Sequence, residues 1–329
     1  MPKVSQEPLI LLTNSRTFKQ MAIVIIRQDN KLEAWKEALL AKAPDIAIYS
    51  YLEEHPKDEI TLAYVWKQPD GLLSQYPNLK CIASFGAGVD FLFKDPSLPK
   101  NVPITRVVDP VLGSDMSEFV LALILGYFKN LNGYKADQLK GVWQPREYKR
   151  ISDVTVGIMG MGALGKLLAE DLVKNKFKVI GWASSSKSLS NVKVFSGEEE
   201  KNTFLSMSNI LVCLLPLTPE TSGILDSSLF EKLPKHAYVI NVARGGHLVD
   251  EDLLEYLDNG HLSGAGLDVF HEEPLPAEHP FWKNPKIHIT PHVASVSDIE
   301  SVIPQLLENY QRLTEGLPLH NTVNREKGY

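Results

Sequence analysis

One segment constrains the fold more than any other: an apolar run that leads through three glycines into a helical pattern. Val154–Met159 has the composition of a buried strand, Gly160, Gly162 and Gly165 follow it, and Leu164–Val173 is amphipathic. The first glycine permits a tight turn, the second lets the backbone approach a pyrophosphate, and the third lets the helix pack closely on the strand. This order predicts a nucleotide-binding unit, with an ordinary structural turn as the alternative.

The rest of the chain alternates between short apolar runs and helical patterns. Nearly continuous apolar runs are typical of parallel strands that are covered on both faces. We expect strands at Ala22–Arg27, Leu62–Val65, Leu79–Phe85, Val154–Met159, Lys178–Trp182, Ile210–Leu215, Tyr238–Val242, Gly264–Val269 and Ile287–Thr290. We expect helices at Leu32–Ala41 and from Asp115 onward, where Asp115-Met-Ser-Glu118 resembles a capping box.

These patterns predict an α/β fold of two domains with doubly wound parallel sheets, since 329 residues are too many for one compact core. Segments near Pro110–Gly113 and Pro291–His292 are candidate crossings between the domains. We therefore expect a dinucleotide-binding Rossmann domain at 114–291. It would be inserted into a smaller substrate domain made of residues 1–113 and 292–329.

Composition excludes several classes of function. The net charge of −6 argues against a nucleic-acid partner. The longest apolar run, Phe119–Phe128, is about half the ~20 residues of a membrane-spanning helix. Cys81 and Cys213 lie in apolar runs and read as buried thiols, which favours a cytoplasmic location. We interpret residues 1–20 as an extended start or a surface tail, with a targeting segment as the alternative.

The strand after the glycine segment predicts the choice of cofactor. An NAD site needs an acidic residue about 20 positions on, to accept hydrogen bonds from the ribose 2′-hydroxyl. Here Ala183 takes that place, and Ser184, Ser185 and Lys187 could receive a 2′-phosphate. We therefore expect NADP(H), with NAD(H) as the alternative. The other reading of this segment is a solvated polar loop.

Three segments of the second half supply an arginine, a carboxylate and a histidine. Arg244 follows an apolar strand in Asn241-Val-Ala-Arg244, Glu273 lies in a loop beside its rival Glu272, and His292 follows Pro291. A guanidinium suits a substrate carboxylate, and an imidazolium stabilised by a carboxylate can protonate a carbonyl oxygen. This set is what the reduction of a small 2-keto acid requires. A loop-capping arginine, a solvated acid and a structural histidine are the alternatives.

Neighbouring histidines raise the question of a metal. His271, His279 and His288 lie close together in the sequence, but no spacing places two of them on one helix face. We expect no metal site.

At this point the chain resembles the D-isomer-specific 2-hydroxyacid dehydrogenase family, and within it the glyoxylate/hydroxypyruvate reductase branch, from Met21 to Tyr329. The motifs that carry the resemblance are Phe85-Gly-Ala-Gly-Val-Asp90, the glycine segment, Leu215-Pro-Leu-Thr-Pro-Glu-Thr221, Asn241-Val-Ala-Arg-Gly, Leu267-Asp-Val-Phe and Thr290-Pro-His-Val-Ala. The resemblance implies a flavodoxin-like substrate domain, a homodimer and NADPH-dependent reduction of glyoxylate or hydroxypyruvate to glycolate or D-glycerate.

The resemblance also implies roles for individual residues. Arg244, Glu273 and His292 would be the catalytic set, and the backbone at Ala87 and Gly88 would hold the substrate carboxylate. Ser295 and Arg244 would contact substrate, and Trp66 is a candidate wall of the substrate pocket. Trp143 resembles a residue that relatives project toward the partner subunit's site. The implied cofactor contacts are Gly160, Met161, Gly162, Ala163, Leu164, Gly165, Ser184, Ser185, Lys187, Leu215, Pro216, Val242, Ala243 and Asp268.

Other functions compete with the reductase. A dehydrogenase of this family could use NAD(H) and another substrate, and a nucleotide-sensing corepressor can keep the same fold and the same three residues. A different Rossmann enzyme, such as a methyltransferase, would not need that trio.

Overall fold

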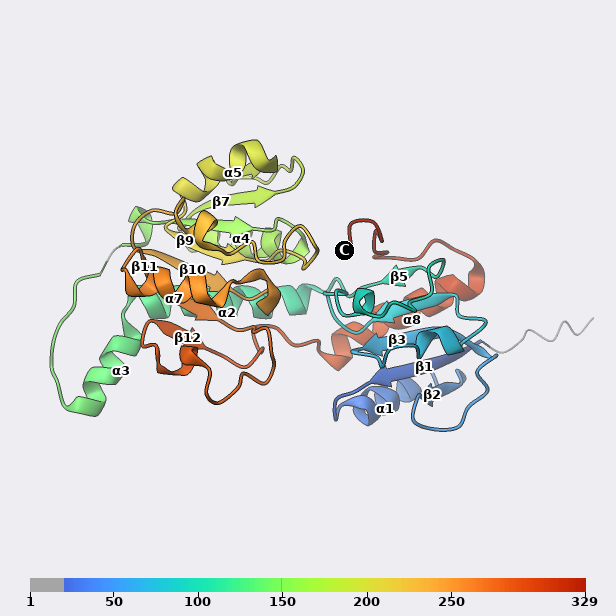
Figure 1. Ribbon diagram of the computed structural model, residues 1–329. Coiled ribbons are helices and arrows are strands. Elements are labelled where there is room, and N and C mark those ends of the chain that lie inside the picture. Colours follow the sequence, from blue (N-terminus) through green and yellow to red (C-terminus); the bar gives the residue numbers. More distant parts are fainter. Residues whose placement is uncertain (1–20, 149) are drawn as a thin grey trace, which may run out of the picture.

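The computed structural model describes residues 21–148 and 150–329, so the interpretation of residues 1–20 lies outside the described part. The chain forms two lobes, each built on a parallel sheet (Figure 1). The first sheet has the strand order β2-β1-β3-β4-β5, which is the flavodoxin-like order. Its strands are β1 (Ala22–Arg27), β2 (Ile48–Ser50), β3 (Ile60–Trp66), β4 (Cys81–Ser84) and β5 (Ile104–Thr105).

The second sheet has seven parallel strands in the order β12-β11-β10-β9-β6-β7-β8. The first strand of this lobe, β6, lies inside the sheet, and the order reverses between β6 and β9, as in a Rossmann fold. Its strands are β6 (Thr155–Met159), β7 (Lys178–Ala183), β8 (Lys193–Ser196), β9 (Ile210–Cys213), β10 (Ala237–Asn241), β11 (Leu262–Leu267) and β12 (Ile287–Ile289). The predicted fold class is confirmed.

Helices lie along these sheets, as parallel crossovers require (Figure 1). They are α1 (Leu32–Lys42), α2 (Pro110–Phe128), α3 (Leu131–Lys140), α4 (Ala163–Lys174), α5 (Gly197–Ser206), α6 (Ser227–Phe230), α7 (Asp250–Asp258) and α8 (Ile299–Glu315). Short 3₁₀ turns are η1 (Leu73–Gln75), η2 (Leu92–Lys94), η3 (Ile151–Asp153), η4 (Gly245–His247) and η5 (Pro280–Lys283).

The C-terminal part of the chain returns to the first lobe. Helix α8 packs on the five-stranded sheet, where the Tyr64 hydroxyl donates to the Leu306 carbonyl at 2.8 Å. Beyond it, Thr322 pairs with Thr105 of β5 in an antiparallel bridge. The seven-stranded lobe is thus an insertion between two parts of the five-stranded lobe. The boundaries at 113/114 and 291/292 stay a prediction, and the first of them falls inside α2.

The predicted start of this helix at Asp115 is wrong. Helix α2 begins at Pro110, five residues earlier. Asp109 caps the helix by accepting a hydrogen bond from the Val111 amide at 3.1 Å, and Pro110 takes the first helical position. An aspartate cap followed by proline is a strong start, and it outweighs the capping-box pattern further on. The segment near Pro110–Gly113 is therefore helical rather than a loop.

By length and composition α2 is long and apolar enough to cross a membrane, with a mean hydropathy of 1.5. In this structure 44% of its most apolar window is buried, and Val120 and Ile124 lie in the core of the second lobe. Gly113 allows the helix to approach α4 closely, because a Cβ there would lie 3.1 Å from the Leu167 side chain. We interpret α2 as a core helix.

Candidate active site at the junction of the lobes

The glycine segment forms the turn from β6 into α4. Gly160 has a φ of +107°, and a Cβ on it would lie 2.6 Å from the Leu214 carbonyl oxygen. A Cβ on Gly165 would lie 1.9 Å from the Gly160 carbonyl oxygen, so a residue with a side chain there would keep the helix from packing this closely on the strand. A Cβ on Gly162 would meet nothing within 4 Å, which leaves the backbone open to a ligand. Each glycine has the environment that its assigned role requires.

This turn fits a dinucleotide phosphate. Gly162 caps α4 without a side-chain hydrogen bond, so the first amides of the helix remain available to an anion. Ala163 is exposed and Leu164 is half-buried, whereas the Met161 side chain is buried against Gly181. Met161 can therefore offer only its backbone to a cofactor.

The other predicted cofactor residues follow neighbouring strands. Leu215 and Pro216 follow β9, and Val242 and Ala243 follow β10, where the Asn241 side chain accepts a hydrogen bond from the Ala243 amide at 3.2 Å. Strands β6, β9 and β10 are adjacent and parallel, so these turns lie at one edge of the sheet. Open α/β sheets bind ligands at this edge.

Strand β7 ends at the buried Ala183, and the polar segment that follows is exposed. Among the residues that the structure describes, Ser184, Ser185 and Lys187 have no partner for their side chains. Three free polar side chains at the carboxyl end of β7 leave room for a phosphate and contain no carboxylate to repel it.

Arg244 joins the two lobes. Its Nε donates to Oδ1 of Asp90 at 2.8 Å, and its Nη1 donates to the Ala243 carbonyl at 2.7 Å. Asp90 belongs to the loop after β4, as do Ala87 and Gly88. A Cβ on Gly88 would lie 1.8 Å from Nη2 of the arginine, so glycine is what permits this approach. Asp90 lies in the motif Phe85-Gly-Ala-Gly-Val-Asp90, but no local pattern identifies Arg244 as its partner.

His292 and Glu273 form a hydrogen-bonded pair. Nδ1 of His292 lies 2.8 Å from Oε2 of Glu273, and Oε1 of Glu273 accepts a hydrogen bond from the Phe270 amide at 3.2 Å. A carboxylate only accepts, so Nδ1 carries the proton and Nε2 remains for a substrate. Within the described residues, the exposed Glu272 has no hydrogen bond or ion pair. Of the two adjacent acids, the structure pairs Glu273 with the histidine.

Burial and His292 act on Glu273 in opposite directions. Burial acts to raise the pKa of this carboxyl, but the hydrogen bond and charge of His292 and the Phe270 amide outweigh it. The pKa of Glu273 is therefore lower than its ordinary value, and the group is ionised at neutral pH.

Asp268 holds the turn that presents His292. The histidine has a φ of +54°, an uncommon conformation for a residue other than glycine. The buried Asp268 carboxylate accepts hydrogen bonds from the Thr290 hydroxyl at 2.6 Å and from the amides of Val293 and Ala294 at 3.0 and 2.8 Å. The Asp268 side chain thus serves this turn, and its predicted contact with the cofactor stays a prediction.

The three candidate catalytic residues follow three adjacent strands. Arg244 follows β10, Glu273 follows β11 and His292 follows β12, and these strands are parallel neighbours in the sheet. The sheet therefore brings all three loops to one edge, which faces the first lobe through the Arg244–Asp90 ion pair.

Of the remaining predicted residues, Trp66 lies in the first lobe, Ser295 lies at the crossing between the lobes and Trp143 lies on the second lobe. Trp66 ends β3, and a Cβ on Gly86 would lie 2.5 Å from its ring, so the ring covers this loop. The Ser295 hydroxyl donates to the Leu112 carbonyl of α2 at 2.6 Å, so it is used within the crossing between the lobes. Trp143 is 96% exposed, and it follows α3.

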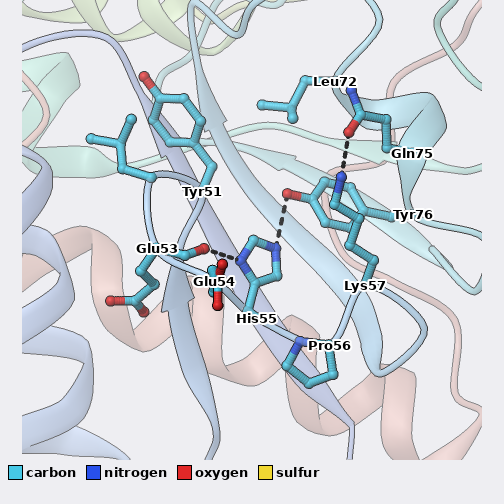
Figure 2. Close-up of a pocket in the computed structure, with 10 residues that line it drawn as sticks. Tyr51, Glu53, Glu54, His55, Pro56, Lys57, Leu72, Gln75 and Tyr76 are labelled. Carbon is cyan, nitrogen blue, oxygen red and sulfur yellow. Dashed lines mark hydrogen bonds between the residues drawn. The ribbon is translucent and has the colours of Figure 1, made fainter.

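A hollow of about 730 Å³ lies elsewhere in the first lobe and contains none of these residues (Figure 2). His55 lies at its centre, with Nδ1 2.7 Å from the Glu53 carbonyl and Nε2 3.2 Å from the Tyr76 hydroxyl. Lys57 and Gln75 form a second hydrogen-bonded pair in its lining. Among the described residues, no group of three or more His, Cys, Asp and Glu side chains could hold a metal ion.

Comparison with known proteins agrees with this geometry. The family model described as D-isomer specific 2-hydroxyacid dehydrogenase, NAD binding domain, matches residues 121–294. Glyoxylate/hydroxypyruvate reductase A of Yersinia enterocolitica is 36% identical over 316 residues, which cover 94% of this chain and 100% of the relative. The protein of that name from Photorhabdus laumondii is 38% identical over 300 residues, which cover 90% of this chain and 96% of the relative.

Solved structures give the same result. A D-isomer specific 2-hydroxyacid dehydrogenase from Xanthobacter autotrophicus, in complex with NADPH and MES, has a TM-score of 0.90 and 36% identity. The NADPH-dependent glyoxylate/hydroxypyruvate reductase of Sinorhizobium meliloti, in complex with NADP and sulfate, has a TM-score of 0.88 and 38% identity. In both cases the match covers 94% of this chain and 100% of the other chain.

The lowered pKa of Glu273 predicts how the pair contributes to stability in acid. A depressed carboxyl pKa stabilises the fold fully above the unfolded value, and this contribution is lost as pH falls through the folded value. We expect the melting temperature of the wild type to exceed that of Glu273→Gln at about pH 6, and the gap to close as pH falls below about 4.5. Thermal unfolding of both proteins at a series of pH values measures this difference in melting temperature.

Glu272→Gln is the matched control, since it removes a carboxylate from the same loop without touching His292. Its difference from the wild type should be small at every pH. A gap for Glu273→Gln that does not change down to about pH 3 would contradict the ionised pair.

Proposed function

Because this chain belongs to the D-isomer-specific 2-hydroxyacid dehydrogenase family, we propose that it reduces glyoxylate and hydroxypyruvate with NADPH, forming glycolate and D-glycerate. The observation that carries the proposal is the arrangement of Arg244 and the His292–Glu273 pair at the ends of three adjacent strands. The relatives that match over nearly all of this chain have the same activity in their names. Oxidation of NADPH in the presence of glyoxylate, followed by its near-ultraviolet absorbance, is the direct test.

The same assay separates the alternatives. A corepressor or a methyltransferase would leave NADPH unchanged. A dehydrogenase of another substrate would oxidise it only with a different keto acid.

Arg244 is suited to bind the substrate carboxylate. Its ion pair with Asp90 fixes the orientation of the guanidinium, and Nη2 points toward Gly88 in the loop after β4. A planar guanidinium binds a carboxylate with two parallel hydrogen bonds, and it can also polarise a neighbouring carbonyl. The backbone amides of Ala87 and Gly88 would complete the grip on the carboxylate. Trp66 would wall the pocket beside them, and Ser295 would lie at its entrance.

His292 is suited to protonate the carbonyl oxygen. Reduction at C2 leaves negative charge on that oxygen, and a nearby imidazolium can deliver a proton to it. Glu273 holds the ring through Nδ1 and stabilises its protonated form, which directs Nε2 to the substrate. Bound NADPH would supply the hydride.

The cofactor is NADP(H), and the chain offers it a matching site. The turn of Gly160, Gly162 and Gly165 with the start of α4 would hold the pyrophosphate. Ser184, Ser185 and Lys187 would hold the 2′-phosphate after β7, where Ala183 replaces the carboxylate of an NAD site. Three of the solved relatives contain NADPH or NADP. Leu215, Pro216, Val242, Ala243 and Asp268 complete the proposed contacts.

We propose a homodimer that forms through the second lobe. None of the α3 residues is buried, and α3 lies away from the sheet (Figure 1). Leu131, Leu139 and Trp143 are 58%, 79% and 96% exposed on α3 and the segment after it. A concentration of exposed apolar side chains on one arm is typical of a surface that a partner covers.

A cytoplasmic location is proposed as well, since Cys81 and Cys213 are both free and buried.

The first prediction from the proposed function is that His292→Ala folds and binds NADPH as the wild type does but loses turnover. Loss of a general acid costs ~10²–10⁴-fold in kcat. The measurement is steady-state reduction of glyoxylate, with NADPH binding followed by fluorescence. His288→Ala is the control, because His288 lies on β12 and, among the described residues, its side chain hydrogen-bonds only to Asn132. A kcat for His292→Ala within about threefold of the wild type would overturn the role of His292.

The second prediction concerns cofactor choice. Ala183→Asp should reverse the preference from NADPH to NADH, because a carboxylate repels the 2′-phosphate and accepts from the 2′-hydroxyl. Lys187→Ala should weaken NADPH by about ten- to a hundredfold and leave NADH nearly unchanged. The measurement is kcat/KM for both cofactors. Lys178→Ala, at the opposite end of β7, is the control. A wild type that uses NADH as well as NADPH would contradict this reading.

The third prediction tests the dimer. Light scattering should give about twice the mass of one chain, and the double variant Leu139→Asp/Trp143→Asp should shift the protein toward the monomer. Leu52→Asp is the control, since Leu52 is 73% exposed in the first lobe. A monomeric wild type, or a control that dissociates as readily, would refute the assignment of this surface.

A further inference from the structure

The loop that carries Glu273 contains two histidines that face one aspartate. Nε2 of His279 lies 3.3 Å from Oδ2 of Asp250, and Nε2 of His271 lies 3.7 Å from Oδ1. Asp250 is the first residue of α7, whereas the histidines lie on either side of Glu273, between β11 and β12. His279 thus ties one flank of Glu273 directly to Asp250, and His271 ties the other flank to the Leu248 carbonyl just before the helix, with Asp250 as its nearest charge.

The surrounding contacts indicate which ring nitrogens carry protons. Nδ1 of His279 accepts a hydrogen bond from the Phe281 amide and caps η5, so the neutral ring has its proton on Nε2, which faces Asp250. Nε2 of His271 lies 2.7 Å from the Leu248 carbonyl, which can only accept, so Nε2 is protonated here as well. Both rings therefore present a hydrogen toward the α7 start.

The loop is also pressed against the segment between β10 and α7. A Cβ on Gly245 would lie 1.9 Å from the carbonyl carbon of Phe270, and the Phe270 amide donates to Glu273. The Asp250 and His279 side chains are 22% and 21% exposed. Burial raises the pKa of Asp250, the charges of His271 and His279 oppose this, and Glu251 adds to it.

We propose that Asp250, through His279 and His271, holds the Glu273 loop at the distance at which Glu273 pairs with His292. The three are positioning residues rather than catalytic ones, since they act through Glu273. The proposal rests on the proposed function, because it assigns them to the proton-transfer pair of that reaction. A shift of the loop by a fraction of an ångström would lengthen the 2.8 Å hydrogen bond and slow the proton transfer.

Two substitutions of His279 separate its contact with Asp250 from its role as the cap of η5. His279→Asn keeps an acceptor near the place of Nδ1, and asparagine caps helices well, but its side chain is too short to reach Asp250. His279→Gln keeps a donor near the place of Nε2 and so retains the tie to Asp250. Asp250→Ala removes the charged partner of both histidines, and His271 keeps its hydrogen bond to the Leu248 carbonyl. Glu251→Gln is the matched control, an exposed carboxylate on the same helical turn.

The expected result is a loss of kcat without a loss of cofactor binding. His279→Asn and Asp250→Ala should lower kcat about tenfold or more with KM for NADPH unchanged, while His279→Gln and Glu251→Gln stay near the wild type. The alkaline limb of the pH–rate profile should move to lower pH in the two impaired variants, since a displaced Glu273 stabilises protonated His292 less well. A merely structural defect would lower the amount of active enzyme at every pH and would not move this limb.

Hydrogen exchange measured by mass spectrometry gives a readout that needs no turnover. In the impaired variants, peptides that cover residues 270–281 should exchange faster, while peptides from the glycine turn stay unchanged. Unchanged kcat, pH profile and exchange in both His279→Asn and Asp250→Ala would overturn the positioning role. A wild type that does not reduce glyoxylate would instead overturn the proposed function, and the exchange experiment would still decide whether the tie exists.

Discussion

The parallel pairing of β10, β11 and β12 is the constraint on which the candidate site depends. Parallel strands start at one edge of a sheet and end at the other, so every loop after a strand emerges on the same side. Arg244, Glu273 and His292 lie far apart in the chain, yet they follow three neighbouring strands. The glycine turn after β6 opens at that edge too. The candidate cofactor and substrate residues are therefore brought to one edge by the sheet topology before any side chain contributes.

The candidate site also requires that the two lobes lie close together, and the Arg244 guanidinium contacts both of them. Arg244 belongs to the seven-stranded lobe but donates to Asp90 of the five-stranded lobe at 2.8 Å. The absence of a Cβ on Gly88 is what lets the guanidinium reach this loop. A substrate carboxylate held between Arg244 and the loop after β4 would therefore contact both lobes at once. The same contact would also hold the two lobes together.

The sequence was sufficient for features that depend on local pattern and not for those that depend on distant partners. The glycine turn, the long apolar strands and the two-domain α/β class have local signatures, and the structure contains all of them. The strands β2, β5 and β8 were not predicted, because they have two to four residues and mix polar with apolar side chains, so no continuous apolar run marks them. The start of α2 was misplaced because two capping signals lie close together. Asp90 was missed because its partner lies 154 residues away.

Four acidic residues lie around the candidate site, and each of them makes a different contact. Glu273 alone pairs with the candidate proton donor, while Asp90 orients the arginine and Asp268 secures the His292 turn. Asp250 faces the two histidines that flank Glu273. Asp268, the most buried of the four, accepts from three donors, and each of the other acids contacts at least one donor from another segment of the chain. Asp90 and Asp268 thus contact the arginine and the His292 turn, and Asp250 would act on the fourth carboxylate in the way we propose. Substitutions at these supporting acids should therefore impair the chemistry even though none of them needs to contact the substrate.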